Sequence, residues 1–364
     1  MSLDSLLVPF RQEIDALDTQ LIALLKKRAL IAEQVGKIKR ENKVYFHRAD
    51  RQAIVFEKVG AHGDEVLSKR ALESIYAEII AACLAKEIGL QVACLGPKGT
   101  YSEEASLAQF GTSAQLMLCD SIDEVVQAVQ TQRSHTAMVP IENSTEGVVT
   151  RTLDLLLTSE VLIQGEISLP IRHQFLSTHT RLEDISTVYA HPQALAQCTK
   201  WLQKYLPKAQ LCATASTAAA AQLASSPENA NQGIAAIASE RAGVEYGLGW
   251  LARNIQDESN NRTRFAELGY FKPAATGNDQ TSIILSTHNR SGSLHHLLEP
   301  FTKNNVSITR FESRPVKNST WDYYFYVDFP GHCSSPNIKA LLADLEKTAT
   351  FYKWLGSYPI RVLN

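Results

Sequence analysis

Residues 10–39 read FRQEIDALDTQLIALLKKRALIAEQVGKIK, a stretch with one glycine and no proline. Apolar residues recur in it at alternating spacings of four and three, which is typical of one long helix with an apolar seam. The pattern extends back to about Leu3 and on to Glu41, so the helix would be roughly 55 Å long. The seam consists of Phe10, Ile14, Leu17, Leu21, Leu24, Arg28, Ile31, Val35 and Ile38. A helix of this length needs a partner of equal length, and a homodimer is the simplest one.

Arg28 interrupts this apolar seam, and a buried charge without a counter-ion is costly. Lys39 follows on the same face after about three turns, whereas Arg11 lies on a face rotated by roughly 100°. Arg28 could lie at the edge of the seam and pair with Glu33, or it could bind an anionic ligand together with Lys39.

Two further helical stretches follow the first, HRADRQAIVFEKV at 47–59 and ALESIYAEIIAACLAKE at 71–87. Together with the pattern FRxxIDxLDxxLIxLLxxR and the VGKIK after it, they resemble the all-helical chorismate mutases. The resemblance implies a dimer of three-helix chains with two sites. The site residues that it implies are Arg28, Lys39, Arg51, Gln52 and Glu87 from one chain and Arg11 from the partner.

Several cations suit this reaction, because chorismate is a dicarboxylate that rearranges in one pericyclic step. The protein needs only to compact it and stabilise charge on the ether oxygen. Gln52 stands where many members have Glu, Glu87 where many have Gln, and Cys83 replaces a hydroxyl residue. Only a protonated Glu can donate to the ether oxygen, so we expect mutase activity to fall as rising pH ionises Glu87.

From Leu90 onward, short β-like runs alternate with capped helices, which indicates α/β organisation. Thr100 and Glu103 fit a capping box, and Ser216 and Ser239 each precede a helix that follows a strand. Helix N-termini present free N–H groups, so a cleft where several converge would bind carboxylates.

The order of motifs in this region is more specific than any one of them. GPKGTYS, VPIENSTEG, IRHQFL, AHPQALAQC, TASTAAAA, AAIASERAGVEYGL and NRTRF resemble the prephenate dehydratases over Val92 to Phe271. The resemblance implies two α/β lobes, similar to periplasmic binding proteins, with the site between them. The reaction would remove carbon dioxide and the C4 hydroxyl from prephenate and give phenylpyruvate, with no metal or organic cofactor. A pure binding module is the alternative for this region.

Thr263 is the leading candidate to deliver a proton or a hydrogen bond to the departing hydroxyl. The other residues implied to bind substrate are Glu142, Asn143, Gln197, Ser216, Thr217, Arg264 and Phe265. His173 and His191 could each act as the acid or have a structural role. Ala190 stands where some relatives have Ser.

The stretch FKPAATGNDQ has the composition of a linker. The pattern after it alternates as strand, helix, strand, strand, helix, strand, which is the ferredoxin-like arrangement. Two motifs there resemble those of the ACT-type regulatory domains of prephenate dehydratases, which implies phenylalanine as effector. Their residues are Gly292, Ser293 and Leu294, and Glu312, Ser313, Arg314 and Pro315. His295 departs from the usual apolar residue after the first motif.

The resulting prediction is a multidomain chain: an all-helical mutase at 1–90, a two-lobed α/β dehydratase at 91–272, a linker at 273–280 and an α+β ACT-type domain at 281–364. A net charge of -2 and six scattered cysteines indicate a cytoplasmic enzyme without nucleic-acid or membrane partners. Its small-molecule partners would be chorismate, prephenate and phenylalanine, and it would form a homodimer or a tetramer. Two alternatives remain, a dehydratase whose helical module only dimerises and a non-catalytic sensor.

Overall fold

The chain folds into two compact units in the computed structural model, which describes residues 3–42, 45, 47–229, 232–315 and 323–363. One unit comprises Met1–Arg48, Val55–Leu90 and Phe110–Gln115. The other comprises Ala49–Ile54, Gln91–Gln109 and Leu116–Asn364.

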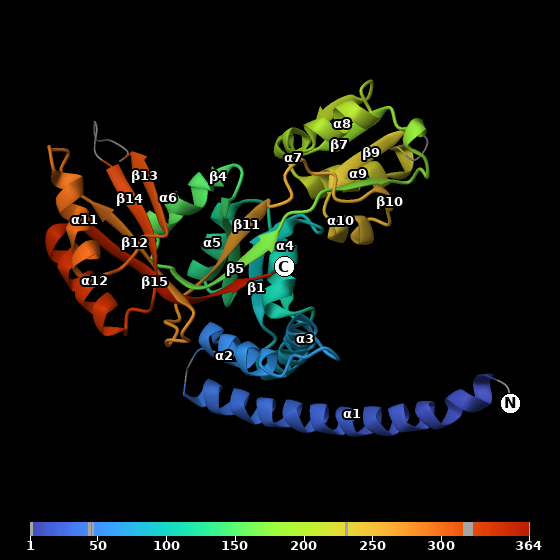
Figure 1. Cartoon of the computed structure of the whole chain (residues 1–364), viewed down its shortest axis with the longest axis horizontal. Helices are drawn as coiled ribbons and strands as arrows, with labels where there is room; N and C mark the ends of the chain where they lie inside the picture. Colours follow the sequence, from blue (N-terminus) through green and yellow to red (C-terminus); the bar gives the residue numbers. More distant parts are fainter. Residues whose placement is uncertain (1–2, 43–44, 46, 230–231, 316–322, 364) are drawn as a thin grey trace. The chain divides into compact units, whose positions relative to one another are not determined.

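The N-terminal region is helical, as its apolar periodicity predicts (Figure 1). Its helices are α1 (Leu3–Glu41), α2 (Ala49–Gly60) and α3 (Lys69–Glu87). Ser68 caps α3 by accepting a hydrogen bond from the N–H of Ala71. Most of the predicted seam of α1 is exposed in the single chain, and Phe10 and Leu24 each keep 64% of their surface in contact with solvent.

Helices α1 and α3 approach each other closely at Gly36. A Cβ atom at this position would lie 2.9 Å from the Cα of Glu87, which is shorter than real contacts of this kind. Glycine therefore allows the C-terminal end of α1 to lie directly against the C-terminal end of α3.

A ten-stranded sheet forms the centre of the second unit, in the order β13-β14-β12-β15-β5-β11-β3-β1-β2, with β4 paired to β3. Its strands are β1 (Gln91–Leu95), β2 (Gln115–Cys119), β3 (Thr136–Asn143), β4 (Gly147–Val148), β5 (Leu162–Pro170), β11 (Arg262–Gly269), β12 (Asp279–Ser286), β13 (Arg310–Pro315), β14 (Tyr323–Pro330) and β15 (Phe351–Val362). The C-terminal strands thus continue the sheet that begins after the helical region.

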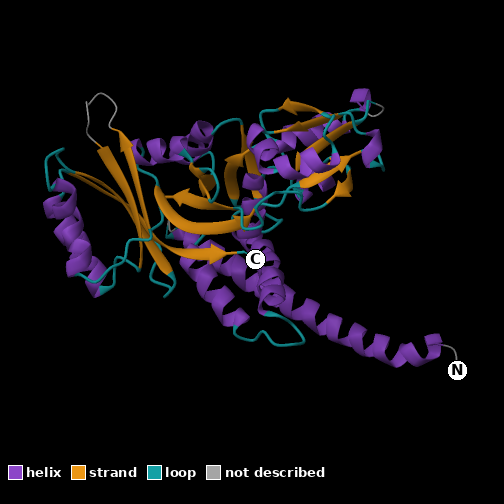
Figure 2. Cartoon of the chain, turned by 45° about the horizontal axis from the view of Figure 1, so that its top comes forward, coloured by secondary structure: helices purple, strands orange, loops and turns teal. Residues whose placement is uncertain are grey.

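A five-stranded sheet, in the order β10-β6-β9-β7-β8, is separate from the large sheet in this unit (Figure 2). Its strands are β6 (Gln174–Ser177), β7 (Thr187–Ala190), β8 (Gln210–Ala213), β9 (Ile234–Ala238) and β10 (Gly249–Ala252). The helices of the unit are α4 (Tyr101–Phe110), α5 (Ile122–Gln130), α6 (Thr150–Thr158), α7 (Pro192–Gln197), α8 (Thr199–Tyr205), α9 (Thr217–Ser225), α10 (Glu240–Glu245), α11 (Ser293–Lys303) and α12 (Pro336–Thr348).

The predicted helix caps form, and one of them also joins two helix starts. Thr100 accepts from the N–H of Glu103, and Ser239 accepts from the N–H of Ala242. The Ser239 hydroxyl also donates to the carbonyl of Gly99 at 2.8 Å, which joins the start of α10 to the start of α4. The starts of α4 and α10 therefore lie next to each other.

Strand β12 connects the C-terminal region to the rest of the unit through both of its faces. Ile283 and Leu285 pack against α11 and α12, which lie on one side of the sheet (Figure 1). Ile284 faces the other way, into the core that contains Val139 and Ala266 of strands β3 and β11. No helix among the described residues combines the length and apolar composition needed to cross a membrane.

Candidate active sites

Arg28 of α1 is half-buried against α3. Its guanidinium donates to the Sγ of Cys83 at 2.8 Å and to the carbonyl of Ile79 at 3.4 Å. Glu33 instead forms an ion pair with Lys37 at 3.6 Å. The contacts therefore favour the second interpretation of Arg28, a cation held at the α1–α3 face and not one neutralised by Glu33.

Lys39 and Glu87 form an ion pair at the same α1–α3 face. The Nζ of Lys39 lies 2.8 Å from Glu87 Oε2, and only 18% and 12% of these side chains are exposed. Glu87 lies one turn after Cys83, so the structure brings Arg28, Lys39 and Glu87 together. A charged carboxylate can only accept hydrogen bonds.

The remaining predicted mutase residues have other contacts. Arg11 is exposed near the start of α1, 3.6 Å from Asp4. Arg51 is exposed on α2. Gln52 is buried, and its amide donates to the main-chain oxygen of Gln109 in α4 at 2.6 Å, a partner that the sequence did not suggest.

Thr263 and Asn143 face each other on neighbouring strands of the large sheet. They are directly paired across β11 and β3, and the Nδ2 of Asn143 donates to Thr263 Oγ1 at 2.9 Å. The Oδ1 of Asn143 accepts from the Thr145 hydroxyl at 2.6 Å. Since Thr263 Oγ1 accepts this bond, its own proton is free to be donated elsewhere.

Gln197 connects this pair to the second sheet. Its Nε2 donates to Thr145 Oγ1 at 2.9 Å, and its Oε1 lies 2.9 Å from the Nε2 of His173 and accepts from Asn261 Nδ2 at 3.0 Å. Burial lowers the pKa of His173, more than its bond to Gln197 raises it. A neutral His173 must carry its proton on Nε2 to donate to the amide oxygen, which leaves Nδ1 as an acceptor 3.2 Å from the Tyr101 hydroxyl. That hydroxyl also donates to the main-chain oxygen of Arg172 at 2.9 Å.

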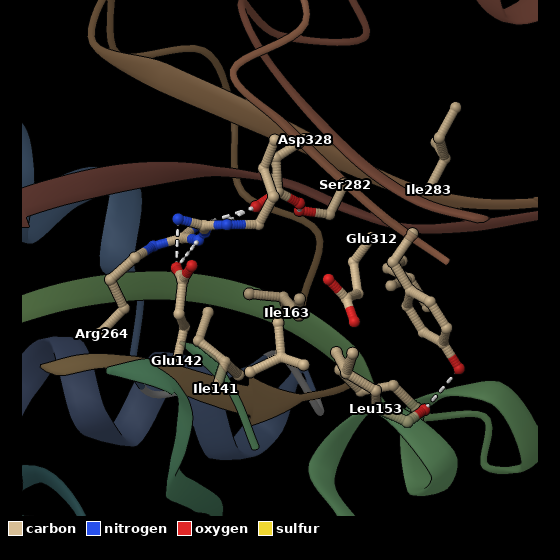
Figure 3. Close-up of a pocket in the computed structure, with 14 residues that line it drawn as sticks. Ile141, Glu142, Leu153, Ile163, Arg264, Ser282, Ile283, Glu312 and Asp328 are labelled. Atoms are coloured by element: carbon tan, nitrogen blue, oxygen red, sulfur yellow. Dashed lines mark hydrogen bonds and ion pairs between the residues drawn. The ribbon is translucent and has the colours of Figure 1, made fainter. Parts of the chain in front are cut away.

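Glu142 and Arg264 lie on the opposite face of the same two strands. They are paired directly, one residue from Asn143 and Thr263, so alternation turns them away from that pair. Arg264 binds Glu166 through Nε at 2.6 Å and Nη2 at 2.5 Å, and it contacts Glu142 at 3.2 Å. These two expected substrate ligands therefore belong to a separate group of charges (Figure 3).

This group, here called the charge cluster, joins the dehydratase strands to the C-terminal strands. Its members are Glu142, Glu166, Arg264, Arg310 and Asp328. Asp328 of β14 lies 3.0 Å from the Nη2 of Arg264 and 3.4 Å from Nη1 of Arg310. Arg310 of β13 also pairs with Glu142.

The charge cluster contains three carboxylates and two guanidiniums. Burial and these neighbouring charges shift the pKa of several of its members. Burial raises the pKa of Glu166, although its bond to Arg264 opposes the shift. Burial also raises the pKa of Glu142, against the attraction of Arg264. Burial disfavours the charged form of Arg264, but Glu166 and Asp328 together outweigh it and raise the pKa of Arg264.

The other predicted dehydratase residues have structural contacts. Ser216 caps α9 by accepting from the N–H of Ala219 at 3.0 Å, and Thr217 is the first residue of that helix. Phe265 is 2% exposed and is part of the core. His191 caps α7 through its Nδ1, and burial lowers its pKa.

The two expected effector motifs lie on different elements. Gly292 has a φ of 82° and precedes α11, which Ser293 and Leu294 begin. The second motif is the edge strand β13, where Glu312 and Arg314 are half-buried and Ser313 and Pro315 are exposed. Glu312 lines a small cavity with Glu142 and Arg264 (Figure 3). Its free volume of about 30 Å³ has room for water but not for an amino acid.

The sequence analysis did not single out several residues of these groups. Asn261, Thr145 and Tyr101 complete the uncharged network, and Glu166, Arg310 and Asp328 complete the charge cluster. Alternation along NRTRF could have separated the two faces of β11, because Asn261 and Thr263 fall on one face and Arg264 on the other. The partners on other strands carry no such local signal.

Three family models match the chain in succession. Chorismate mutase type II matches residues 10–88, prephenate dehydratase matches 92–272, and the ACT domain matches 281–347.

Proteins similar over their whole length carry both activities in their names. A bifunctional chorismate mutase/prephenate dehydratase of Aquifex aeolicus is 42% identical over 97% of this chain and 98% of its own. One of Neisseria gonorrhoeae is 39% identical over 100% of this chain and 99% of its own. A crystal structure of prephenate dehydratase from Arthrobacter aurescens in complex with L-Phe is 32% identical, covers 74% of this chain and 90% of that one, and has a TM-score of 0.69. The chain therefore belongs to the bifunctional chorismate mutase/prephenate dehydratases and contains an ACT domain.

Proposed function

We propose that the dehydratase reaction takes place at the uncharged network of Thr263, Asn143 and Gln197. The bond from Asn143 to Thr263 Oγ1 is the observation that carries this proposal, because it leaves the Thr263 proton to the substrate. As the bond to the departing carboxylate breaks, its electron pair enters the ring and the C4 hydroxyl leaves. That hydroxyl takes up a proton to leave as water, and Thr263 donates to it or relays the proton.

A neutral network suits this role. A threonine hydroxyl is a weak acid, so its contribution is a directed hydrogen bond to an oxygen that gains charge in the transition state. His173 is buried and committed to Gln197 and Tyr101, which favours its structural role over that of the acid. Asn143 and Gln197 would orient the substrate from two sides.

Substitution of Thr263 tests this proposal. Thr263→Val keeps the shape but removes the hydroxyl, and we expect dehydratase kcat to fall by about 100-fold or more. Thr263→Ser retains the hydroxyl and should keep most of the rate. Equal kcat values for Thr263→Val and wild type would contradict the proposal.

For the mutase, the proposed site is the α1–α3 face of Arg28 and Lys39, with Arg11 supplied by a second copy and Arg51 by α2. The contacts of Gln52 with α4 support a role for it in holding the start of α2. The exposed seam of α1 supports a homodimer. Sedimentation of the full chain over a range of concentrations tests this, and a monomer throughout would contradict it.

Phenylalanine would bind at the two ACT motifs, and the charge cluster would carry its effect to β3 and β11. The strand order β13-β14-β12-β15 and the helices α11 and α12 support a ferredoxin-like domain, and the two sheets support two lobes like those of periplasmic binding proteins. The domain limits 1–90, 91–272 and 281–364, with 273–280 as linker, remain part of the proposal. Six free cysteines suit a reducing cytoplasm.

A further inference from the structure

Asn261 is buried at the point where the uncharged network passes from the large sheet to α7. Only 2% of its surface is exposed. Its Oδ1 accepts from Asn143 Nδ2 at 2.8 Å, and its Nδ2 donates to Gln197 Oε1 at 3.0 Å. It precedes β11 and lies on the same face as Thr263, two residues before it. One side chain therefore binds the amides of both Asn143, which contacts Thr263, and Gln197.

The neighbours of Asn261 fix which way its amide points. The Oδ1 of Asn143 accepts from the Thr145 hydroxyl and from the N–H groups of Thr145 and Glu146, so its Nδ2 must face Asn261. The Oε1 of Gln197 lies against His173 Nε2, so it requires a donor from Asn261. Turning the Asn261 amide around would place two NH₂ groups together on one side and two oxygens together on the other.

This arrangement has a consequence for Thr263. Asn143 Nδ2 binds both Asn261 Oδ1 and Thr263 Oγ1. If Asn143 loses the acceptor at 261, the donors to its Oδ1 still keep the amide the same way round, and its Nδ2 still reaches the main-chain oxygen of Arg262 at 3.2 Å. The Nδ2 can then shift towards that oxygen, which misaligns the bond that directs the Thr263 proton. Gln197 loses a donor at the same time, although its bond to Thr145 remains.

We propose that Asn261 is a positioning residue of the dehydratase, which sets the orientation of Asn143 and Gln197 without touching prephenate. The inference rests on the proposed function of Thr263. Its effect belongs to kcat and not to KM, because the binding groups remain present and only their alignment with the reacting atoms changes. Misalignment of this kind costs up to about 100-fold in rate.

A structural role for a buried asparagine would have different consequences. If Asn261 had only a structural role, its substitution would lower the stability of the unit and with it the binding of phenylalanine. The chain itself provides controls for folding, since mutase activity and phenylalanine binding can be measured in the same sample. Asn260 is the matched control position, because it is adjacent, of the same type and exposed, and only its main-chain oxygen has a described hydrogen bond.

The experiment measures dehydratase kcat and KM for the full chain with Asn261→Ala, Asn261→Asp and Asn260→Ala. We expect Asn261→Ala to lower kcat by about 10- to 100-fold, with KM within about threefold of wild type. Mutase activity and phenylalanine binding should be unchanged, and Asn260→Ala should match wild type. A kcat for Asn261→Ala within threefold of wild type would overturn the inference, and so would a parallel loss of mutase activity or phenylalanine binding.

Asn261→Asp supplies a pH signature that packing alone would not produce. The introduced carboxylate accepts from Asn143 but cannot donate to Gln197, whereas its protonated form has the same donor and acceptor as the native amide. The kcat of Asn261→Asp relative to wild type should therefore rise by about tenfold as the pH falls through the range in which that carboxyl is protonated. A constant ratio across that range would assign the loss to packing.

Parallel measurement of Thr263→Val separates this inference from the function on which it rests. If Thr263→Val is inactive and Asn261→Ala is fully active, only the role of Asn261 is wrong. If Thr263→Val is fully active, the proposed role of Thr263 is wrong regardless of Asn261.

Discussion

At the scale of single residues, Glu87 occupies a position where ionisation decides what it can do. Its carboxylate lies 2.8 Å from the Nζ of Lys39 and is mostly buried. While charged, it can neither donate to the ether oxygen of chorismate nor release Lys39 for a substrate carboxylate. The same side chain would donate once protonated.

Glu87→Gln tests this role. The amide donates at every pH and does not pair with Lys39, so we expect mutase kcat/KM above pH 8 to exceed that of wild type by about tenfold. The wild-type rate should fall as pH rises and the variant's should stay level. Glu33→Gln, on the same module but paired with Lys37, is the control. Parallel profiles for wild type and Glu87→Gln would contradict the assignment.

Glu104 of α4 links ionisation to stability. Burial, reinforced by Glu240, raises its pKa to about 7, against the opposing charges of Arg241 and Arg172. Between its unfolded value near 4.5 and about 7, the native state holds a proton that the unfolded state has lost. The free energy of unfolding therefore decreases as pH rises through this window and stays low above it.

Urea denaturation of Glu104→Gln at pH 5 and pH 8 measures this effect. The variant cannot ionise, so it should exceed wild type by about 3 kcal/mol at pH 8 and differ little at pH 5. Glu258→Gln, at an exposed position, should match wild type at both values. The same difference at the two pH values would show that Glu104 does not titrate as described.

At the scale of elements, strands β3 and β11 have the proposed dehydratase site on one face and the charge cluster on the other. Thr263 and Asn143 face the uncharged network, while Arg264 and Glu142 reach Asp328 and Arg310 on the ACT strands. Adjacent residues of one strand thus connect the catalytic group to the regulatory domain. A change in β13 or β14 would reach Thr263 through one peptide unit.

Asp328→Asn should weaken this connection. It removes a charge from the contacts with Arg264 and Arg310, so we expect the phenylalanine concentration for half-inhibition to rise by about tenfold, with a much smaller change in uninhibited kcat. Asp344→Asn is the matched control, because Asp344 is also in the ACT domain but pairs with Lys303 on the surface. Unchanged inhibition in Asp328→Asn would exclude the charge cluster as the route.

Local patterns in the sequence predicted the elements better than the contacts between them. The bounds of α1, the caps at Thr100, Ser216 and Ser239, and the strand and helix order after 279 all follow from periodicity and capping chemistry. The bond between Ser239 and Gly99 joins segments 140 positions apart, and no local pattern encodes it. Glu142 and Arg264 were expected in the site because they adjoin Asn143 and Thr263 in the motifs, yet the pleat of the strands turns them away.

At the scale of the whole molecule, one chain contains two chemistries with opposite requirements. The proposed mutase face of α1 and α3 has cations for a dicarboxylate, whereas the proposed dehydratase network consists of amides, hydroxyls and a neutral imidazole. The ACT domain shares a continuous sheet with the dehydratase strands, since β15 pairs with β5. Regulation through this sheet would act first on the dehydratase.

The most direct test measures two turnover rates in full chains that carry Arg28→Ala or Thr263→Val. One is the formation of prephenate from chorismate, and the other is the formation of phenylpyruvate from prephenate. Arg28→Ala should lower mutase kcat/KM by about 100-fold or more and leave the dehydratase near wild type. Thr263→Val should have the opposite effect, with the mutase unchanged and dehydratase kcat reduced by about 100-fold or more. If either variant loses both activities together, the two reactions do not have the separate sites described for them.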